Sequence, residues 1–240
     1  MRAVIFAMVV SATVSPVLAA DLEQPIPAEL PYSWTGFYAG VNAGAAFDMS
    51  KFDNTADPNR FLQPVPNMNF SGTGFLGGVH VGYNYQMGNY VVGVEGSADL
   101  GTLDDKAKTP VAPLGSGFIE LKQKWLASIA GRIGYAYDRF LVYGTGGVAF
   151  TSYGVNTDDS FFIGHFTHSY NDNTRVGWTI GAGVEYAIDP KWTIGVDYKY
   201  YDFGSKNYAS NFAPAAGPGF DFFKVKERES VVTARLSYRF

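Results

Sequence analysis

The chain has 240 residues, of which only 17% are charged, and a formal net charge of −4. Cysteine is absent, which excludes a disulfide framework, a thiol nucleophile and a thiolate metal site. A mildly acidic chain without runs of Lys and Arg also argues against a nucleic-acid partner, whose phosphates require basic patches. The 28 Gly, 16 Tyr and 19 Phe indicate a β-rich chain, less charged than the roughly 25% typical of a soluble domain.

Residues 1–19 are typical of a cleaved secretory signal peptide. Arg2 gives the positive start, residues 3–14 form an apolar run, and residues 17–19 (VLA) form a cleavage site of the A-x-A type. A transmembrane helix is the alternative, but polar residues and Pro16 interrupt a run that is already short for spanning. Residues 20–33 follow as a proline-rich periplasmic tether, expected outside any sheet because proline cannot donate a ladder hydrogen bond.

Eight amphipathic segments occupy residues 34–240, and each carries apolar side chains at every second position. Such alternation predicts strands with one apolar and one polar face. The apolar faces run over residues 37–47, 77–85, 90–100, 125–135, about 141–153, 176–186, 192–200 and 232–240. In the fifth segment Leu141 and Tyr143 compete with Val142, Val148 and Phe150, so the pattern leaves its facing open.

The connections between these segments alternate in length. Tight turns are predicted at residues 87–89, 138–140 and 189–191, which are rich in turn formers. Long polar loops are predicted near residues 48–72, 101–122, 154–174 and 202–226, as surface excursions without packed cores of their own. This alternation predicts an all-β fold, an eight-stranded antiparallel up-and-down transmembrane barrel with four long extracellular loops.

The polar faces of the segments are rich in small residues and not in Lys or Glu. Small side chains suit the crowded interior of an eight-stranded barrel, so we expect the apolar faces to meet lipid. A secreted soluble carrier of the lipocalin type is the alternative, and it would turn the apolar faces inward.

Aromatic residues recur near both ends of the apolar faces. Trp178 and Tyr186 are eight positions apart, roughly 26 Å of strand, which on tilting approaches the ~25 Å apolar band that aromatic girdles flank in such barrels. The predicted girdle consists of Phe37, Phe47, Trp125, Tyr135, Trp178, Tyr186, Trp192, Tyr200 and Tyr238.

Five segments carry a family resemblance: WTGFYAGVNAG (34–44), YGTGGVAF (143–150), GWTIGAGVEYAI (177–188), VDYKYYDFG (196–204) and ARLSYRF (234–240). They resemble the small outer-membrane barrels of alphaproteobacteria, which include major surface antigens and haemin-binding proteins and are related in fold to opacity-type and OmpA-type barrels. The resemblance implies insertion in the outer membrane by the barrel assembly machinery, with periplasmic chaperones on the way. It also implies that the terminal aromatic residues Tyr238 and Phe240 act as the assembly signal.

Charged residues on the polar faces form the first candidate site. A buried charge is costly unless it is paired, so acids and bases from different strands should meet in the interior. A plug of salt bridges is the favoured interpretation, because eight strands leave little room for a wet channel. An ion-selective pore is the alternative. The residues are Glu95, Asp99, Arg132, Glu185, Asp197, Lys199, Arg235 and Arg239.

The third long loop holds His165 and His168, an H-x-x-H pair that could bind a metal ion or haem iron. Two solvated loop residues are the plainer interpretation, and the resemblance transfers no haemin motif to them. The same loop contains Ser and Asp, but without a G-x-S-x-G elbow we do not expect an enzyme. No cofactor is predicted.

These observations predict an integral outer-membrane barrel with a structural and surface role. It would support membrane integrity, contact outer-membrane lipid and lipopolysaccharide, and expose its loops. A narrow porin or a haemin-binding surface receptor is the alternative function.

Overall fold

The computed structural model describes residues 32–54, 68–69, 72–101, 104–111, 115–161, 164–171, 174–212 and 219–240. The predicted signal peptide and the tether up to residue 31 lie outside the described residues. Among the described residues, no helix has the length and apolar character needed to cross a membrane.

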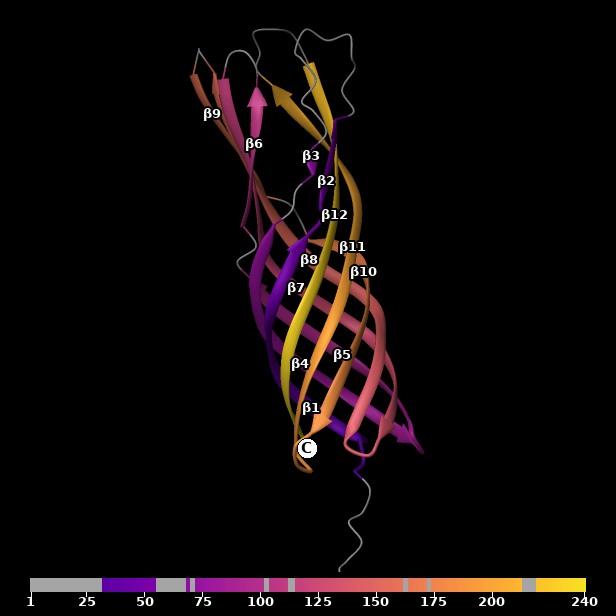
Figure 1. Cartoon of the computed structure of the whole chain (residues 1–240). Helices are drawn as coiled ribbons and strands as arrows, with labels where there is room; N and C mark the ends of the chain where they lie inside the picture. Colours follow the sequence, from indigo (N-terminus) through magenta and orange to yellow (C-terminus); the bar gives the residue numbers. More distant parts are fainter. Residues whose placement is uncertain are drawn as a thin grey trace, which may run out of the picture. The chain divides into compact units, whose positions relative to one another are not determined.

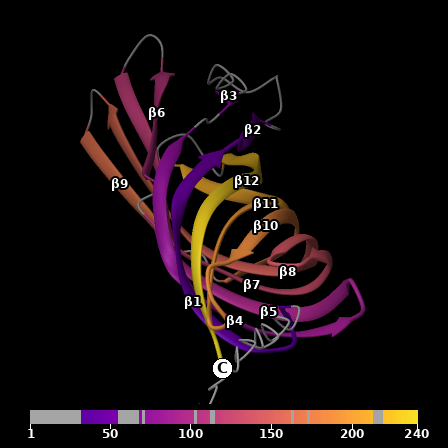
Figure 2. The ribbon, with the colours of Figure 1, turned by 60° about the horizontal axis from the view of Figure 1, so that its bottom comes forward.

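Eight antiparallel strands close into a barrel, which confirms the predicted fold (Figure 1). Each strand pairs with the next, and β1 pairs with β12 to complete the ring, as Figure 2 shows where the indigo and yellow strands lie side by side. The strands are β1 (Gly36–Asp48), β4 (Thr73–Met87), β5 (Tyr90–Gly101), β7 (Gly115–Tyr137), β8 (Phe140–Phe161), β10 (Arg175–Ala187), β11 (Trp192–Phe212) and β12 (Gly219–Arg239).

Strand pairing continues beyond the barrel into segments that we predicted as loops. Four shorter strands, β2 (Lys51–Asn54), β3 (Met68–Asn69), β6 (Asp104–Val111) and β9 (Gly164–Asn171), extend the sheet at the end opposite the C-terminus (Figure 1). β6 pairs with β7, β9 with β8, and β2 with β12. The prediction of long polar loops was therefore wrong for these segments, because the backbone hydrogen bonds of an antiparallel pair require no apolar alternation in the side chains.

Tight turns join the strands at the other end of the barrel, as predicted. Gly88 and Asp138 adopt positive φ angles of 62° and 50° in the first two turns. In the third turn a carboxylate oxygen of Asp189 accepts hydrogen bonds from the backbone amides of Lys191 and Trp192, at 2.7 and 2.8 Å. We call this end of the barrel the turn end and the opposite end the loop end.

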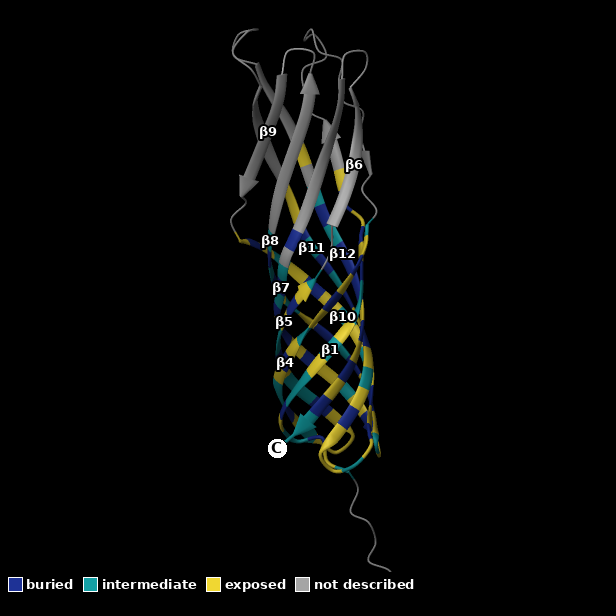
Figure 3. Ribbon diagram, turned by 90° about the vertical axis from the view of Figure 1, so that its left-hand side faces the viewer, coloured by how far each residue is buried: buried dark blue, intermediate teal, exposed yellow. Residues whose placement is uncertain are grey.

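Along the barrel strands apolar outward positions alternate with buried polar inward positions, which is the predicted facing (Figure 3). Ile180 and Val94 are 56% and 61% exposed, whereas Glu185 and Glu95 are 4% and 3% exposed. The structure also settles the fifth strand, because Val142 faces outward and Leu141 is fully buried.

Aromatic side chains ring the outer surface at two levels. Pairs of rings pack across neighbouring strands, with centroids 5.1 Å apart in a T-shaped pair of Trp192 and Tyr238 and 5.6 Å apart in a tilted pair of Trp178 and Tyr200. Of the predicted girdle, Phe37, Tyr135, Tyr186, Trp192 and Tyr238 lie towards the turn end, and Phe47, Trp125, Trp178 and Tyr200 lie towards the loop end.

Candidate functional site

Six charged side chains meet inside the barrel, and Arg235 of β12 lies at their centre. Its guanidinium contacts Glu95 of β5 at 2.5 Å and Asp197 of β11 at 2.8 Å. Lys199, also on β11, reaches the other oxygen of Glu95 at 3.1 Å. Since these strands lie on different sides of the ring, the contacts tie opposite walls together. Strands and not loops carry every residue, so the register of the sheet fixes their positions and the packing around them restricts their rotamers.

Arg132 of β7 forms the second centre of the same cluster. It contacts Glu185 of β10 at 2.8 Å and Glu95 at 3.7 Å. Its guanidinium carbon lies 3.6 Å from the ring centroid of Tyr143, a cation–π distance. The Tyr38 hydroxyl completes the cluster, because it donates to Glu95 at 2.9 Å and accepts from Arg132 at 3.2 Å.

The cluster is balanced in charge. We call it the central charge network, and it consists of Glu95, Glu185, Asp197, Arg132, Lys199 and Arg235. Three carboxylates face three cations, and each of the six side chains has at most 9% of its surface exposed. Pairing of this kind is what allows buried charges to persist in a site with little water.

Two of the predicted inward charges lie outside this network. Asp99 points inward but is held by the side-chain amide of Asn42, which donates to it. Arg239 belongs to the rim of the turn end, where it donates to the carbonyl of Pro190 at 2.8 Å and lies 4.4 Å from the ring centroid of Tyr32. The prediction that Arg239 joins the interior network was wrong, since the last inward position of β12 already lies at the mouth of the barrel.

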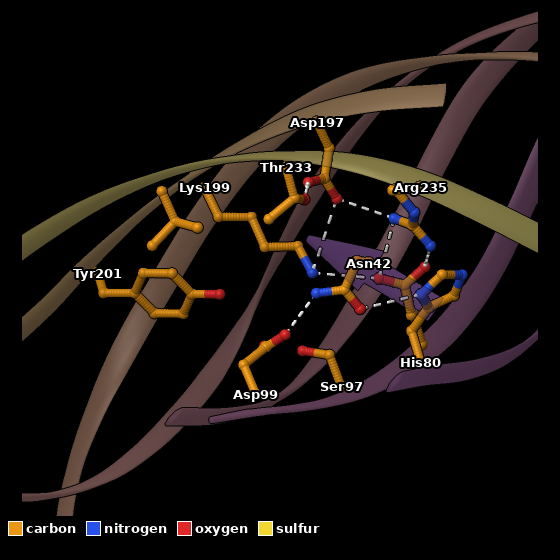
Figure 4. A pocket seen from close by; sticks show the side chains of 11 residues that line it. Asn42, His80, Ser97, Asp99, Asp197, Lys199, Tyr201, Thr233 and Arg235 are labelled. Atoms are coloured by element: carbon orange, nitrogen blue, oxygen red, sulfur yellow. Dashed lines mark hydrogen bonds and ion pairs between the residues drawn. The ribbon is translucent and has the colours of Figure 1, made fainter. Parts of the chain in front are cut away.

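Little free space remains within the network (Figure 4). A cavity of about 10 Å³ lies between Asn42, His80, Glu95 and Lys199, roughly the minimum for a single water molecule. His80 fills the space next to it, with hydrogen-bonding distances of 2.8 Å to the Ser237 hydroxyl and 3.3 Å to the Asn42 carbonyl oxygen.

Close packing also explains why inward positions of the barrel wall are so often glycine. A Cβ atom at Gly40 would approach the His80 ring to 2.5 Å, and one at Gly183 would approach the Tyr143 hydroxyl to 2.4 Å. The large polar side chains of the interior therefore need these glycines on the neighbouring strands.

Apolar layers lie on both sides of the central charge network. Towards the loop end a cluster of Ala46, Leu76, Leu126, Ala149, Tyr201, Phe203 and Val231 fills the interior. Towards the turn end a second cluster contains Trp34, Val91, Ala136, Leu141, Tyr143 and Ala187. Water is thus excluded from both directions, which strengthens the ion pairs between the layers.

Trp34 closes the turn end of the barrel, a role that the sequence did not reveal. Its side chain is 2% exposed, although it precedes the first strand. The indole N–H donates to the carbonyl of Asp138 at 3.3 Å, and its backbone N–H donates to the Gln86 side chain at 2.6 Å. Tyr32 packs beside it at a centroid distance of 5.0 Å, so the end of the predicted tether is anchored to the barrel.

A Trp34→Phe substitution is expected to lower the free energy of unfolding by about 1 kcal/mol, because it removes one partly buried hydrogen bond and keeps most of the aromatic volume. Urea titration of the folded protein in detergent measures this difference. Trp178→Phe is the matched control, since Trp178 lies on the outer surface. Equal stability of the Trp34→Phe variant and the wild type would show that the indole hydrogen bond contributes nothing.

A separate group of buried polar residues lies above the apolar layer at the loop end. Arg175 of β10 contacts Glu227 of β12 at 2.7 Å, and the Gln123 amide donates to Glu229 at 2.9 Å. Glu227 and Glu229 were not among the predicted inward charges, because the apolar face of the last strand was predicted to begin at residue 232. The alternation of acids with Lys226, Arg228 and Ser230 was the signal that could have extended it.

The predicted histidine pair lies in β9, where His165 stands opposite Ser160 and His168 opposite Thr157. The side chains of both histidines lie outside those that the structure describes, so the metal or haem prediction for this pair stays a prediction. Among the described residues no group of three or more His, Asp or Glu side chains is arranged to hold a metal ion.

Comparisons with known proteins agree with this architecture. Residues 5–240 match the family described as "Outer membrane protein beta-barrel domain". A 31 kDa outer-membrane immunogenic protein of Brucella melitensis is 34% identical over 220 residues, which cover 86% of this chain and 89% of that protein. A 22 kDa outer membrane protein of Rhizobium leguminosarum is 34% identical over 185 residues, covering 77% of this chain and 72% of that protein.

Solved structures of low sequence identity share the fold. The outer membrane protein OprG of Pseudomonas aeruginosa aligns with a TM-score of 0.54 at 15% identity, covering 87% of this chain and 98% of its own. The outer membrane protease OmpT of Escherichia coli aligns with the same TM-score at 10% identity, covering 89% of this chain and 99% of its own. At these identities the likeness concerns the fold alone.

Proposed function

Since this chain belongs to the outer membrane β-barrel family, we propose that it acts as a closed structural barrel that presents surface strands and loops. The observation that carries this proposal is the central charge network, neutral in sum and enclosed by apolar layers on both sides. Such an interior stabilises the barrel and offers no continuous wet path.

A narrow pore is the alternative that the same interior disfavours. Conduction needs a path wider than an ion, whereas the cavity between Asn42 and Lys199 measures about 10 Å³. Salt bridges between Arg235 and its two carboxylates would also have to break as each ion passes.

Planar bilayer recordings test the proposal directly. Folded wild-type protein is expected to give no uniform conductance steps, because the interior holds at most isolated water. Heat-modifiable mobility of the same sample on a gel verifies that folded barrels were used. Discrete steps of reproducible size, abolished by boiling the sample, would identify a pore and contradict the proposal.

The surface role is supported by the position of the strand extensions. They lie at the loop end, which faces outward in outer-membrane barrels, whereas the short turns face the periplasm. Relatives such as the Brucella melitensis protein are named immunogenic outer-membrane proteins, which accords with an exposed loop end. We infer that this end contacts lipopolysaccharide and that the barrel contributes to membrane integrity.

The turn end carries the proposed assembly signal. Tyr238 and Phe240 pack edge to face with centroids 5.2 Å apart, and the Phe240 backbone N–H donates to the Phe37 carbonyl at 3.0 Å. We propose that the barrel assembly machinery and periplasmic chaperones recognise these residues before the ring closes. No catalytic role or haemin site is proposed, because no cluster of described residues supports either.

A further inference from the structure

A row of basic side chains follows the outward face of β12 beyond the loop-end girdle. Lys224, Lys226 and Arg228 occupy alternate positions and are exposed or partly exposed, whereas Glu227 and Glu229 between and beside them point inward and are buried. Alternation therefore sorts a mixed acidic and basic sequence into a basic outer face and an acidic inner face.

Strand pairing places a further lysine in this row. β2 runs beside β12 with Lys51 directly opposite Lys226, and Lys51 is exposed. Directly opposed residues of an antiparallel pair have Cβ atoms about 4.5–5.5 Å apart, and like charges at that distance destabilise the sheet. An anion between the two ammonium groups would remove this cost.

The other basic residues of the row stand opposite acidic positions of the neighbouring strands. Arg228 contacts Asp202 of β11 at 3.0 Å, and Lys224 stands opposite Asp53 in the register. Among the side chains that the structure describes, Lys51 and Lys226 have no ion-pairing partner.

The height of this pair above the apolar band indicates what the anion is. Phe47, Ser230 and Tyr200 form one level of the loop-end girdle, and Lys226 lies four residues beyond Ser230 on the same face. Four residues of strand rise about 13 Å, and tilt of the strand reduces the height further. The polar headgroup region is about 5–8 Å thick on each side of the hydrocarbon core. Because lysine stems can bend towards a membrane surface, both ammonium groups can reach headgroup phosphates.

We propose that Lys51 and Lys226 bind a phosphate group of a phosphorylated glycolipid in the outer leaflet. The site rests on the proposed surface role and gives its lipid contact a location and a chemistry. Two ammonium groups can share the oxygens of one phosphate, and the girdle below them packs against the acyl chains of the same lipid. An anion free in solution would satisfy the same charges but would not contact the girdle.

The test compares lipid retention by folded protein in phosphatidylcholine nanodiscs, with native mass spectrometry of the released complexes. The probes are bisphosphorylated lipid A, the same lipid after enzymatic dephosphorylation, and inorganic phosphate. Wild-type protein is expected to retain the bisphosphorylated lipid at least tenfold better than the dephosphorylated lipid. The Lys51→Gln/Lys226→Gln double variant is expected to lose this preference, because each lysine near an anionic surface contributes roughly a fivefold gain in affinity.

Lys191→Gln is the matched control, because Lys191 is an exposed lysine at the turn end, and it should keep the wild-type preference. Retention of both lipids at the same level, or an unchanged preference in the double variant, would contradict phosphate binding by Lys51 and Lys226. If millimolar inorganic phosphate displaced the bound lipid A, the site would bind free phosphate, which would contradict a membrane lipid as its ligand. If the wild-type protein conducts ions and still prefers the phosphorylated lipid, the closed barrel is refuted while the lipid site is supported.

Discussion

Replacement of Arg235 by alanine is expected to lower the free energy of unfolding by about 3–5 kcal/mol, the usual cost of removing one partner from a buried ion pair. Glu95 and Asp197 would lose their shortest contacts, at 2.5 and 2.8 Å, while remaining in a layer that both apolar clusters shield from water. Lys199 would still contact both carboxylates, at 3.1 and 3.9 Å, and Arg132 would contact Glu95 at 3.7 Å.

Equilibrium unfolding in urea, followed by tryptophan fluorescence in lipid vesicles, measures this cost. Arg239→Ala is the matched control, because Arg239 contacts a carbonyl at the exposed rim, and a loss below about 1 kcal/mol is expected for it. If Arg235→Ala does not fold, Arg235→Lys keeps one positive charge with fewer donors and should fall between the wild type and the alanine variant. Equal losses for Arg235→Ala and Arg239→Ala would contradict the central position of Arg235.

An arginine at Ala182 is expected to cost about 2–4 kcal/mol of folding free energy, the range for a basic residue at the lipid-facing midplane of a barrel. Ala182 lies outward on β10, between Gly144 of β8 and Tyr198 of β11. Its distance from both aromatic levels leaves the guanidinium without water or headgroups, except by bending along the barrel surface.

The same change at Ile188 is the control, because Ile188 follows β10 at the turn end and is 48% exposed. A position near the membrane interface costs about 0–1 kcal/mol, so the two variants should differ clearly when folded into the same vesicles. If Ala182→Arg proves no more costly than Ile188→Arg, the outward face of β10 does not meet hydrocarbon.

Apolar alternation was sufficient to predict the eight barrel strands and the facing of all but the fifth, because lipid favours apolar side chains and the packed interior favours small or polar ones. Beyond the girdle the strands no longer separate lipid from a packed interior, and there the strand extensions were not predicted. β7 begins at Gly115, ten residues before the first residue of the predicted apolar face, Trp125. Backbone hydrogen bonds hold this extension together, and they leave no pattern in the side chains.

The interior could be predicted as a set of inward charges but not as a network. The alternation within each strand identifies Glu95 and Arg235 as inward residues. Their contact, however, depends on closure of the ring, which brings β5 and β12 together across the interior. Tyr143 was missed because the two faces of its strand carry similar apolar residues. Trp34 was missed because it precedes the first strand and reaches the interior from the mouth of the barrel.

Photolabelling with a lipid-soluble carbene precursor, read out by peptide mass spectrometry, tests the facing on which all these results depend. The account predicts insertion at Val94, Ile180 and Leu236, which are 61%, 56% and 40% exposed on the outer surface. It predicts none at Glu185 and Arg235, which are each 4% exposed. Labelling of Glu185 and Arg235 with sparing of the three apolar residues would mean that the barrel is built with the opposite facing.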